Sequence, residues 1–286
     1  MKKYFSLVLF AHTIFAMPFA LIGFFLAVTT TDHTFNWLKL VLMILCMVFA
    51  RNSAMAFNRY LDRQIDAENP RTVIRDIPAG KISAEGALLF TIINCLLFIT
   101  ATLFINPLCF YLSPVALAVV LGYSYTKRFT PLCHLILGLG LALAPIGAYL
   151  VVTGEFALLP IFFSLAVLCW VSGFDIIYAL QDEEFDRQKG LNSIPAWLGK
   201  KRALQVSSFL HFLTVLFIAL PLLFTPLSWF YIAGILFFIV LLIYQHQLVK
   251  PDDLSKVNRA FFTTNGIASV VFAAFFFLDI YLRNQF

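Results

Sequence analysis

Charged residues are scarce in this sequence of 286 residues, and their scarcity excludes most classes of protein. Asp, Glu, Lys and Arg make up 12% of the chain and hydrophobic residues 61%, whereas an average soluble domain has about a quarter charged residues. This composition excludes a soluble globular protein, and the abundance of Phe, Leu, Ile and Val excludes a disordered chain. Since a membrane-spanning helix needs about 20 mostly apolar residues, the chain has room for roughly eight or nine spans and little else.

Cysteine is also sparse, and its placement excludes two kinds of stabilising site. Five cysteines lie inside apolar stretches: Cys46, Cys95, Cys109, Cys133 and Cys169. Their number is odd and no C-x-x-C pair occurs, so we predict neither a disulfide framework nor a zinc site. Packing as small buried side chains is the expected role of these thiols.

Long apolar runs fill most of the chain. We predict nine spans, at 6–28, 37–57, 86–105, 108–125, 132–152, 157–180, 204–224, 227–246 and 260–281. The first is too long for a cleavable signal peptide and is expected to be retained. Because backbone groups in hydrocarbon must be hydrogen-bonded within the chain, each span should be helical. The sequence predicts an all-α, polytopic membrane protein with one domain over 1–286.

The basic residues are distributed unevenly over the predicted loops. With a cytoplasmic N-terminus, the inward loops 1–5, 58–85, 126–131, 181–203 and 247–259 hold every basic residue except Lys39, Arg51 and Arg283. This is the positive-inside pattern of a multi-pass protein, here expected in the inner cell membrane. The net charge of +5 therefore reports topology and does not predict nucleic-acid binding.

Two apolar helices are predicted to end in rows of acidic residues at the cytoplasmic side. Asn58, Asp62 and Asp66 are four residues apart, which on a helix places them within an arc of about 80° and about 12 Å of rise. Asp182 and Asp186 repeat the D-x-x-x-D spacing. Each motif is followed by Ile-Pro and then Gly-Lys, which suggests two four-helix repeats plus one helix.

Paired carboxylates at a helix end need a compensating cation, because like charges four residues apart destabilise a helix. Hard carboxylate oxygens suit Mg²⁺, which is held by one or two carboxylates together with substrate phosphates. An alternative is that these carboxylates are simply solvated, but two such rows on apolar helices favour metal. The predicted metal ligands are Asn58, Asp62, Asp66, Asp182 and Asp186, and the four aspartates are the predicted catalytic residues.

Further polar residues lie near the two motifs. Arg51 and Asp175 lie deeper in their spans, either as a structural ion pair or as a substrate-carboxylate clamp and a proton or gating site. Lys127 and Arg128 are equally compatible with interfacial anchoring and with phosphate binding. The predicted substrate-binding residues are Arg51, Asn58, Arg71, Lys127, Arg128, Asp175, Tyr178 and Lys189.

These motifs resemble those of the UbiA family of intramembrane aromatic prenyltransferases. Asn58-x-x-x-Asp62-x-x-x-Asp66 is similar to its first motif, Asp182-x-x-x-Asp186 to its second, and Tyr123-x-x-x-Lys127-Arg128 to its Y-x-x-x-K-R turn. Two features depart from the family pattern: Arg59 replaces the usual Asp, and Phe10-Ala11-His12-Thr13 replaces an early basic residue. Both resemble the branch of 4-hydroxybenzoate polyprenyltransferase-like proteins that includes enzymes of the futalosine route to menaquinone.

The resemblance implies that Mg²⁺ held by the acidic residues binds a polyprenyl diphosphate, whose prenyl group is transferred to an aromatic hydroxy acid in respiratory quinone biosynthesis. The acceptor is expected to be 4-hydroxybenzoate-like, with a dihydroxynaphthoate as the alternative. An ion-coupled transporter is the rival class, but it would place charges near mid-span on discontinuous helices. Most charges here lie at one cytoplasmic end, which favours an enzyme.

Overall fold

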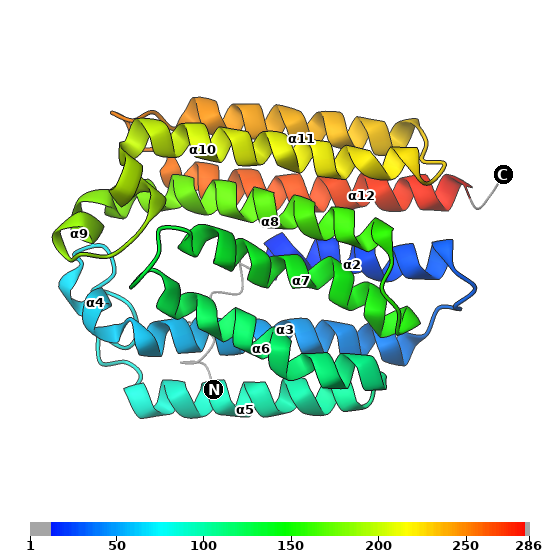
Figure 1. Cartoon of the computed structure of the whole chain (residues 1–286), viewed down its shortest axis with the longest axis horizontal. Helices are drawn as coiled ribbons and strands as arrows, with labels where there is room; N and C mark the ends of the chain where they lie inside the picture. Colours follow the sequence, from blue (N-terminus) through cyan, green and yellow to red (C-terminus); the bar gives the residue numbers. More distant parts are fainter. Residues whose placement is uncertain (1–12, 284–286) are drawn as a thin grey trace.

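The computed structural model describes residues 13–283, and helices account for most of them. The α-helices are α2 (Thr13–Thr30), α3 (Trp37–Leu61), α4 (Arg63–Glu68), α5 (Ala84–Leu103), α6 (Pro107–Thr126), α7 (Cys133–Thr153), α8 (Leu158–Ala179), α9 (Glu183–Gln188), α10 (Ile194–Ala219), α11 (Trp229–Leu248) and α12 (Asn265–Arg283). A π-helical turn at Arg259–Thr264 leads into α12. The long helices lie alongside one another in a bundle, with the short α4 and α9 together at one end (Figure 1).

Eight helical segments are long and apolar enough to cross a membrane, which confirms the predicted all-α membrane fold. They match the second to ninth predicted spans. The described part of the first span is the shorter apolar stretch Phe15–Thr30, and residues 6–12 of that span lie outside the described residues. Lys2, Lys3 and the Phe10–His12 part of the departing segment lie there too.

One helix begins earlier than the apolar pattern predicts. α10 starts at Ile194, ten residues before the predicted span at 204–224, because the Ser193 hydroxyl accepts a hydrogen bond from the Ala196 amide and Pro195 occupies the first turn. Gly199, at φ 76°, then breaks the helical backbone. The positively charged stretch after Gly199 hid this first turn from a prediction based on apolar length.

Aromatic side chains fill the core between the helices. Trp170 of α8 contacts Phe19 of α2, Phe174 of its own helix and Phe238 of α11, with ring centroids 5.2–5.5 Å apart. Its indole Nε1 donates a 3.1 Å hydrogen bond to Asn265 Oδ1, so no polar group of this ring is left unpaired. This packing holds α8, which carries the second acidic motif, at the centre of the bundle.

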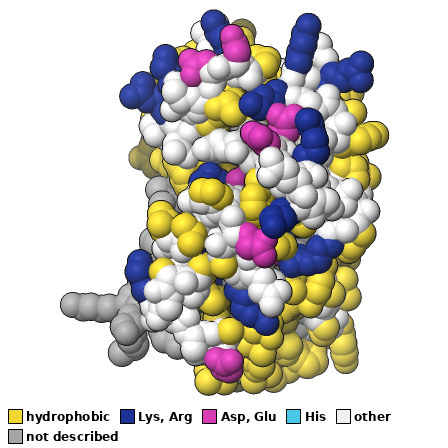
Figure 2. Space-filling model, turned by 90° about the vertical axis from the view of Figure 1, so that its left-hand side faces the viewer, with side chains coloured by type: hydrophobic (Ala, Val, Ile, Leu, Met, Phe, Trp, Pro, Cys, Tyr) yellow, Lys and Arg dark blue, Asp and Glu magenta, His cyan; other side chains and the backbone are white. Residues whose placement is uncertain are grey.

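Charged side chains gather at the end of the molecule that α4, α9 and their loops form (Figure 2). At the opposite end, Trp37 and Trp229 begin α3 and α11 and are largely exposed, as expected for aromatic residues at a membrane interface. The bundle therefore has one polar end and an apolar body.

Candidate active site

Both acidic motifs lie where a long helix breaks into a short one. α3 ends at Leu61, Asp62 leaves helical geometry with φ −88° and ψ 4°, and Asp66 lies in α4. In the second motif a 3₁₀ turn, Leu180–Asp182, separates α8 from α9, which carries Asp186. Helical hydrogen bonds nevertheless continue through the first motif, from the Asp62 amide to the Asn58 carbonyl oxygen and from the Asp66 amide to the Asp62 carbonyl oxygen. At each distortion the carboxylate is paired with cations of another segment, Asp62 with Lys127 and Arg128, and Asp182 with Arg71.

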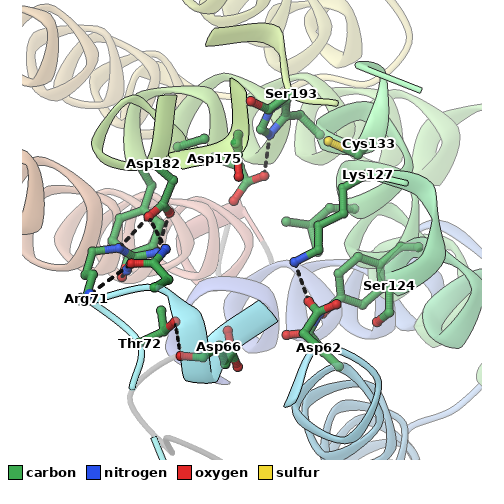
Figure 3. Close-up of a pocket in the computed structure, with 18 of the residues that line it drawn as sticks. Asp62, Asp66, Arg71, Thr72, Ser124, Lys127, Cys133, Asp175, Asp182 and Ser193 are labelled. Carbon is green, nitrogen blue, oxygen red and sulfur yellow. Dashed lines mark hydrogen bonds and ion pairs between the residues drawn. The ribbon is translucent and has the colours of Figure 1, made fainter. Parts of the chain in front are cut away.

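All four predicted catalytic aspartates line one cavity of about 230 Å³. Asn58, Arg71, Lys127, Asp175 and Tyr178 also line it. Figure 3 shows Asp62 with Lys127 on one side and Asp182 with Arg71 on the other, with the Asp175 carboxylate pointing into the space between them. The two motifs thus face each other, although they are more than a hundred residues apart in the chain.

Asp62 is held by the loop between α6 and α7. Its side chain is 2% exposed, and its two oxygens lie 2.6 Å from Lys127 Nζ and 2.9 Å from Arg128 Nη2. Asn58 Nδ2 donates a 3.1 Å hydrogen bond to the same carboxylate. Lys127 therefore points into the cavity, which favours phosphate binding over interfacial anchoring. Arg128 does not line the cavity and contributes to the site through its ion pair with Asp62.

Asp66 is held by a cation of its own loop, but one of its oxygens has no hydrogen bond. Arg75 Nη1 donates a 2.7 Å hydrogen bond to Oδ1, and Arg59 Nη1 lies 3.9 Å from Oδ2. Oδ2 is buried and has no hydrogen-bond partner. A buried carboxylate oxygen without a hydrogen bond is costly, so this atom points to a cationic ligand in the cavity.

Asp182 is held by the loop of the other motif. Arg71 forms a bidentate ion pair with its two oxygens, and Asn69 Nδ2 donates a 3.0 Å hydrogen bond to Oδ1. Arg71 Nη1 also donates a 2.9 Å hydrogen bond to the Tyr178 hydroxyl. Partial burial lowers the pKa of Arg71, but the hydrogen bond and charge of Asp182 outweigh it and leave that pKa above its ordinary value, so Arg71 stays cationic.

A second, apolar cavity of about 490 Å³ adjoins the charged one and runs between α3, α6 and α7. Arg51 lies in its wall among residues such as Met43, Leu141 and Val151. The Nε atom of Arg51 is buried without a hydrogen-bond partner. Asp175 is paired with His134 instead, at 2.6 Å between Oδ2 and Nδ1, so the alternative of a structural Arg51–Asp175 pair is wrong.

Two predicted substrate-binding residues line neither cavity: Arg128, which is paired with Asp62, and Lys189. Lys189 forms an ion pair with Glu68, and about half of each of these side chains is exposed. The pair ties the end of α9 to the end of α4. Substrate binding by Lys189 stays a prediction, and the geometry gives it a surface position.

Several residues of the site are not predictable from the sequence pattern. His134, Asn69, Thr72 and Ser193 line the charged cavity. His134 shares no metal-ligand spacing with the other histidines, and its partner Asp175 is 41 residues away. Only the packing of α7 against α8 brings them together, so no local pattern could have found this pair.

The oxygen donors around the charged cavity suit a hard divalent cation, provided that the arginine and lysine partners of the carboxylates are drawn away. Among residues 13–283, no three Asp, Glu, His or Cys side chains converge closely enough to hold an ion by themselves. The carboxylates are instead drawn toward arginine and lysine. An ion would have to compete with those side chains, and a diphosphate, which carries negative charge for them to bind, would release the carboxylates.

A helical membrane bundle with a charged cavity at one end and an apolar cavity beneath it defines an intramembrane enzyme that handles an amphipathic substrate. Residues 16–276 match the model of the UbiA prenyltransferase family. The chain belongs to this family and is a multi-pass integral membrane protein.

Solved and curated relatives agree with this assignment. The chain is similar to the apo structure of a UbiA homologue from Aeropyrum pernix K1, with a TM-score of 0.85, 31% identity and coverage of 94% of this chain and 98% of that one. A UbiA homologue from Archaeoglobus fulgidus has the same fold, with a TM-score of 0.74 at 24% identity, over 97% of this chain and 99% of that one. The 4-hydroxybenzoate octaprenyltransferase of Tolumonas auensis is 30% identical over 236 residues, 82% of each chain.

Proposed function

We propose that this protein transfers a polyprenyl group from its diphosphate to an aromatic hydroxy acid of the 4-hydroxybenzoate type. The observation that carries the proposal is the pair of adjoining cavities, one lined by both acidic motifs and the other apolar. A prenyl diphosphate has the matching division between a charged head and an apolar tail. The relatives named 4-hydroxybenzoate octaprenyltransferase support the choice of acceptor.

The diphosphate head would lie in the charged cavity together with Mg²⁺. The Archaeoglobus fulgidus homologue was solved bound to GPP and Mg²⁺, which supports this assignment. Here Asn58, Asp62, Asp66, Asp182 and Asp186 would hold the ion, and Arg71 and Lys127 would bind phosphate oxygens. The ion supplies Lewis-acid stabilisation of the charge that develops on the leaving diphosphate.

The acceptor would lie in the apolar cavity with its carboxylate on Arg51. Burying a charged group without a partner costs on the order of several kcal/mol, and the unpaired Nε of Arg51 indicates a substrate anion as the partner. The apolar walls would keep water away from the reactive allylic carbon. A dihydroxynaphthoate carries the same carboxylate and hydroxyl groups and is the second candidate.

The presence of Arg59 supports a dihydroxynaphthoate as the second candidate acceptor. It replaces the Asp of the usual family motif and lies 3.9 Å from Asp66, so it adds positive charge where that motif has a further carboxylate. The departure alters the wall of the apolar cavity, which Arg59 lines. We expect it to affect the choice of acceptor more than the reaction class.

We place the protein in the inner cell membrane with the site on the cytoplasmic side. The loops of the charged end carry most of the basic residues, and positively charged loops stay in the cytoplasm. Soluble aromatic acids would reach the site from that side.

The test is a transfer assay in membranes that contain the full chain. Membranes are incubated with Mg²⁺, a polyprenyl diphosphate and one of several acids, among them 4-hydroxybenzoate and 1,4-dihydroxy-2-naphthoate, and the products are identified by mass. We expect a prenylated aromatic acid, formed more slowly by Arg51→Leu than by the wild type. Product from neither acid would contradict the proposed function, and conductance or counterflow would then test the transporter alternative.

A further inference from the structure

Six side chains line both cavities and therefore surround their boundary: Asn58, Arg75, Tyr123, Leu137, Asp175 and Tyr178. If the diphosphate lies in the charged cavity and the tail in the apolar one, the carbon–oxygen bond between them lies at this boundary. The acceptor ring must approach the same place to react. The groups that act on the reacting carbon atoms are therefore to be sought among these six.

Asp175 is the one carboxylate among the six. Asn58 donates to Asp62, Arg75 donates to Asp66, and the Tyr178 hydroxyl accepts from Arg71. Phenols such as those of Tyr123 and Tyr178 ordinarily hold their protons at neutral pH, whereas a carboxylate is ordinarily ionised there. Asp175 is thus the side chain at the boundary best suited to receive a proton.

His134 holds one oxygen of Asp175 and leaves the other facing the cavity. His134 Nε2 accepts a 3.3 Å hydrogen bond from the amide of Ile194, the first residue of α10, whose N–H has no acceptor within its own helix. Since Nε2 accepts, the ring proton is on Nδ1, which donates to Asp175 Oδ2 at 2.6 Å. The His134 side chain is 4% exposed and that of Asp175 22%, so the histidine is enclosed while the carboxylate reaches open space.

We propose, on the basis of the prenyl transfer proposed above, that Asp175 is the catalytic base that removes the ring proton of the acceptor. The carbon–oxygen bond of the prenyl diphosphate breaks, and its electron pair leaves with the diphosphate. A ring carbon next to the hydroxyl forms the new carbon–carbon bond to the allylic carbon and becomes tetrahedral. Its C–H electron pair then restores the aromatic ring, and the proton passes to the free oxygen of Asp175 and from there to water in the charged cavity.

His134 is a positioning residue in this scheme. It fixes the orientation of the Asp175 carboxylate through a hydrogen bond whose direction the Ile194 amide determines. Because Nε2 is already occupied by that amide, His134 has no free site for the transferred proton. Its loss should therefore impair the reaction less than the loss of Asp175.

The experiment compares two reactions of the same full-length protein, with Mg²⁺ and geranyl diphosphate. One is transfer to 4-hydroxybenzoate or its ring-deuterated form, and the other is release of diphosphate without an acceptor, which needs no ring proton removed. For Asp175→Asn we expect transfer to fall by about 10²–10⁴-fold and diphosphate release to stay near the wild-type rate. Transfer by this variant should also show a primary deuterium isotope effect that the wild type lacks, because proton removal becomes rate-limiting.

Three further variants make the result decisive. Asp175→Glu keeps a base and should recover part of the activity. His134→Gln should give a smaller loss with the same isotope effect. Glu184→Gln removes an exposed carboxylate of α9 outside both cavities and should behave as wild type.

The outcomes separate this proposal from the function on which it rests. If the wild type forms no prenylated aromatic product, both the proposed function and the role of Asp175 as the catalytic base are contradicted. If the wild type is active, the base alone is contradicted by either of two results. One is an unaffected Asp175→Asn variant, and the other is a variant that loses transfer and diphosphate release together without an isotope effect.

Discussion

The two acidic motifs are built on the same plan but are held differently. Asp62 and Asp66 are 2% and 4% exposed at their side chains, whereas Asp182 is 17% exposed. Asp62 is held by the loop after α6, and Asp182 is held by Arg71 of the loop after α4. The first motif is thus enclosed, and its loop in turn holds the second. The comparison indicates that the site is assembled by contacts between loops, with the helices setting their spacing.

The largest effect is expected from removing a carboxylate of the enclosed motif. Asp62→Ala should lower prenyl transfer by about 10²–10³-fold or more, because it removes a metal ligand and leaves Lys127 and Arg128 without their partner. Asp186→Ala in the open motif should also abolish transfer while leaving fewer buried charges unpaired. Transfer rates in membranes, normalised to the amount of inserted protein, measure both.

The two substitutions also test the comparison between the motifs. If enclosure matters, Asp62→Ala should lower the thermal stability of the purified protein more than Asp186→Ala does. Full transfer activity in either variant would contradict the assignment of both motifs to one diphosphate.

Removal of divalent cations should be nearly as severe and should affect both motifs together. We expect EDTA to stop transfer and added Mg²⁺ to restore it, because carboxylates and a diphosphate are both negatively charged and would need a divalent cation to lie close together. The measurement is the rate of product formation before chelation, after chelation and after Mg²⁺ is added back. Turnover that resists EDTA would refute the metal-held diphosphate.

Arg51→Leu should have a smaller and more selective effect. A hydrogen bond to a charged group contributes about 1.5–3 kcal/mol, which corresponds to roughly a 10–150-fold rise in KM for a carboxylate acceptor. The KM for the prenyl diphosphate should change less, because Arg51 does not line the charged cavity in which the diphosphate head would lie and the apolar tail needs no cation. Equal turnover of carboxylate acceptors by variant and wild type would contradict the proposal that Arg51 binds the carboxylate of the acceptor.

The smallest effect is expected at Lys189. Its ion pair with Glu68 is about half exposed, and such pairs contribute about 0–1 kcal/mol. Lys189→Ala should therefore change transfer by less than about fivefold, whereas Lys127→Ala, which removes the lysine inside the cavity, should change it far more. Equal losses in these two matched variants would show that the charged end acts as a diffuse surface and not as a defined cavity.

Much of the fold followed from the sequence, because apolar runs of about 20 residues have few alternatives to a membrane helix. The acidic residues of the site followed from their spacing. The breaks at Asp62 and Asp182 did not, since the cations paired with these carboxylates belong to other segments of the chain. The contact between His134 and Asp175 depends on how α7 packs on α8, which no local pattern encodes. The predicted repeat of two four-helix units stays a prediction.

Binding of one inert prenyl diphosphate analogue tests the central claim most directly. The affinity of the purified protein for geranyl thiodiphosphate is measured with and without Mg²⁺ for the wild type, Asp62→Asn, Asp186→Asn and Lys189→Ala. We predict binding that requires Mg²⁺, weakens strongly when either motif is changed and persists in Lys189→Ala. Wild-type affinity in one of the two motif variants would show that a single motif binds the diphosphate, and would contradict the account.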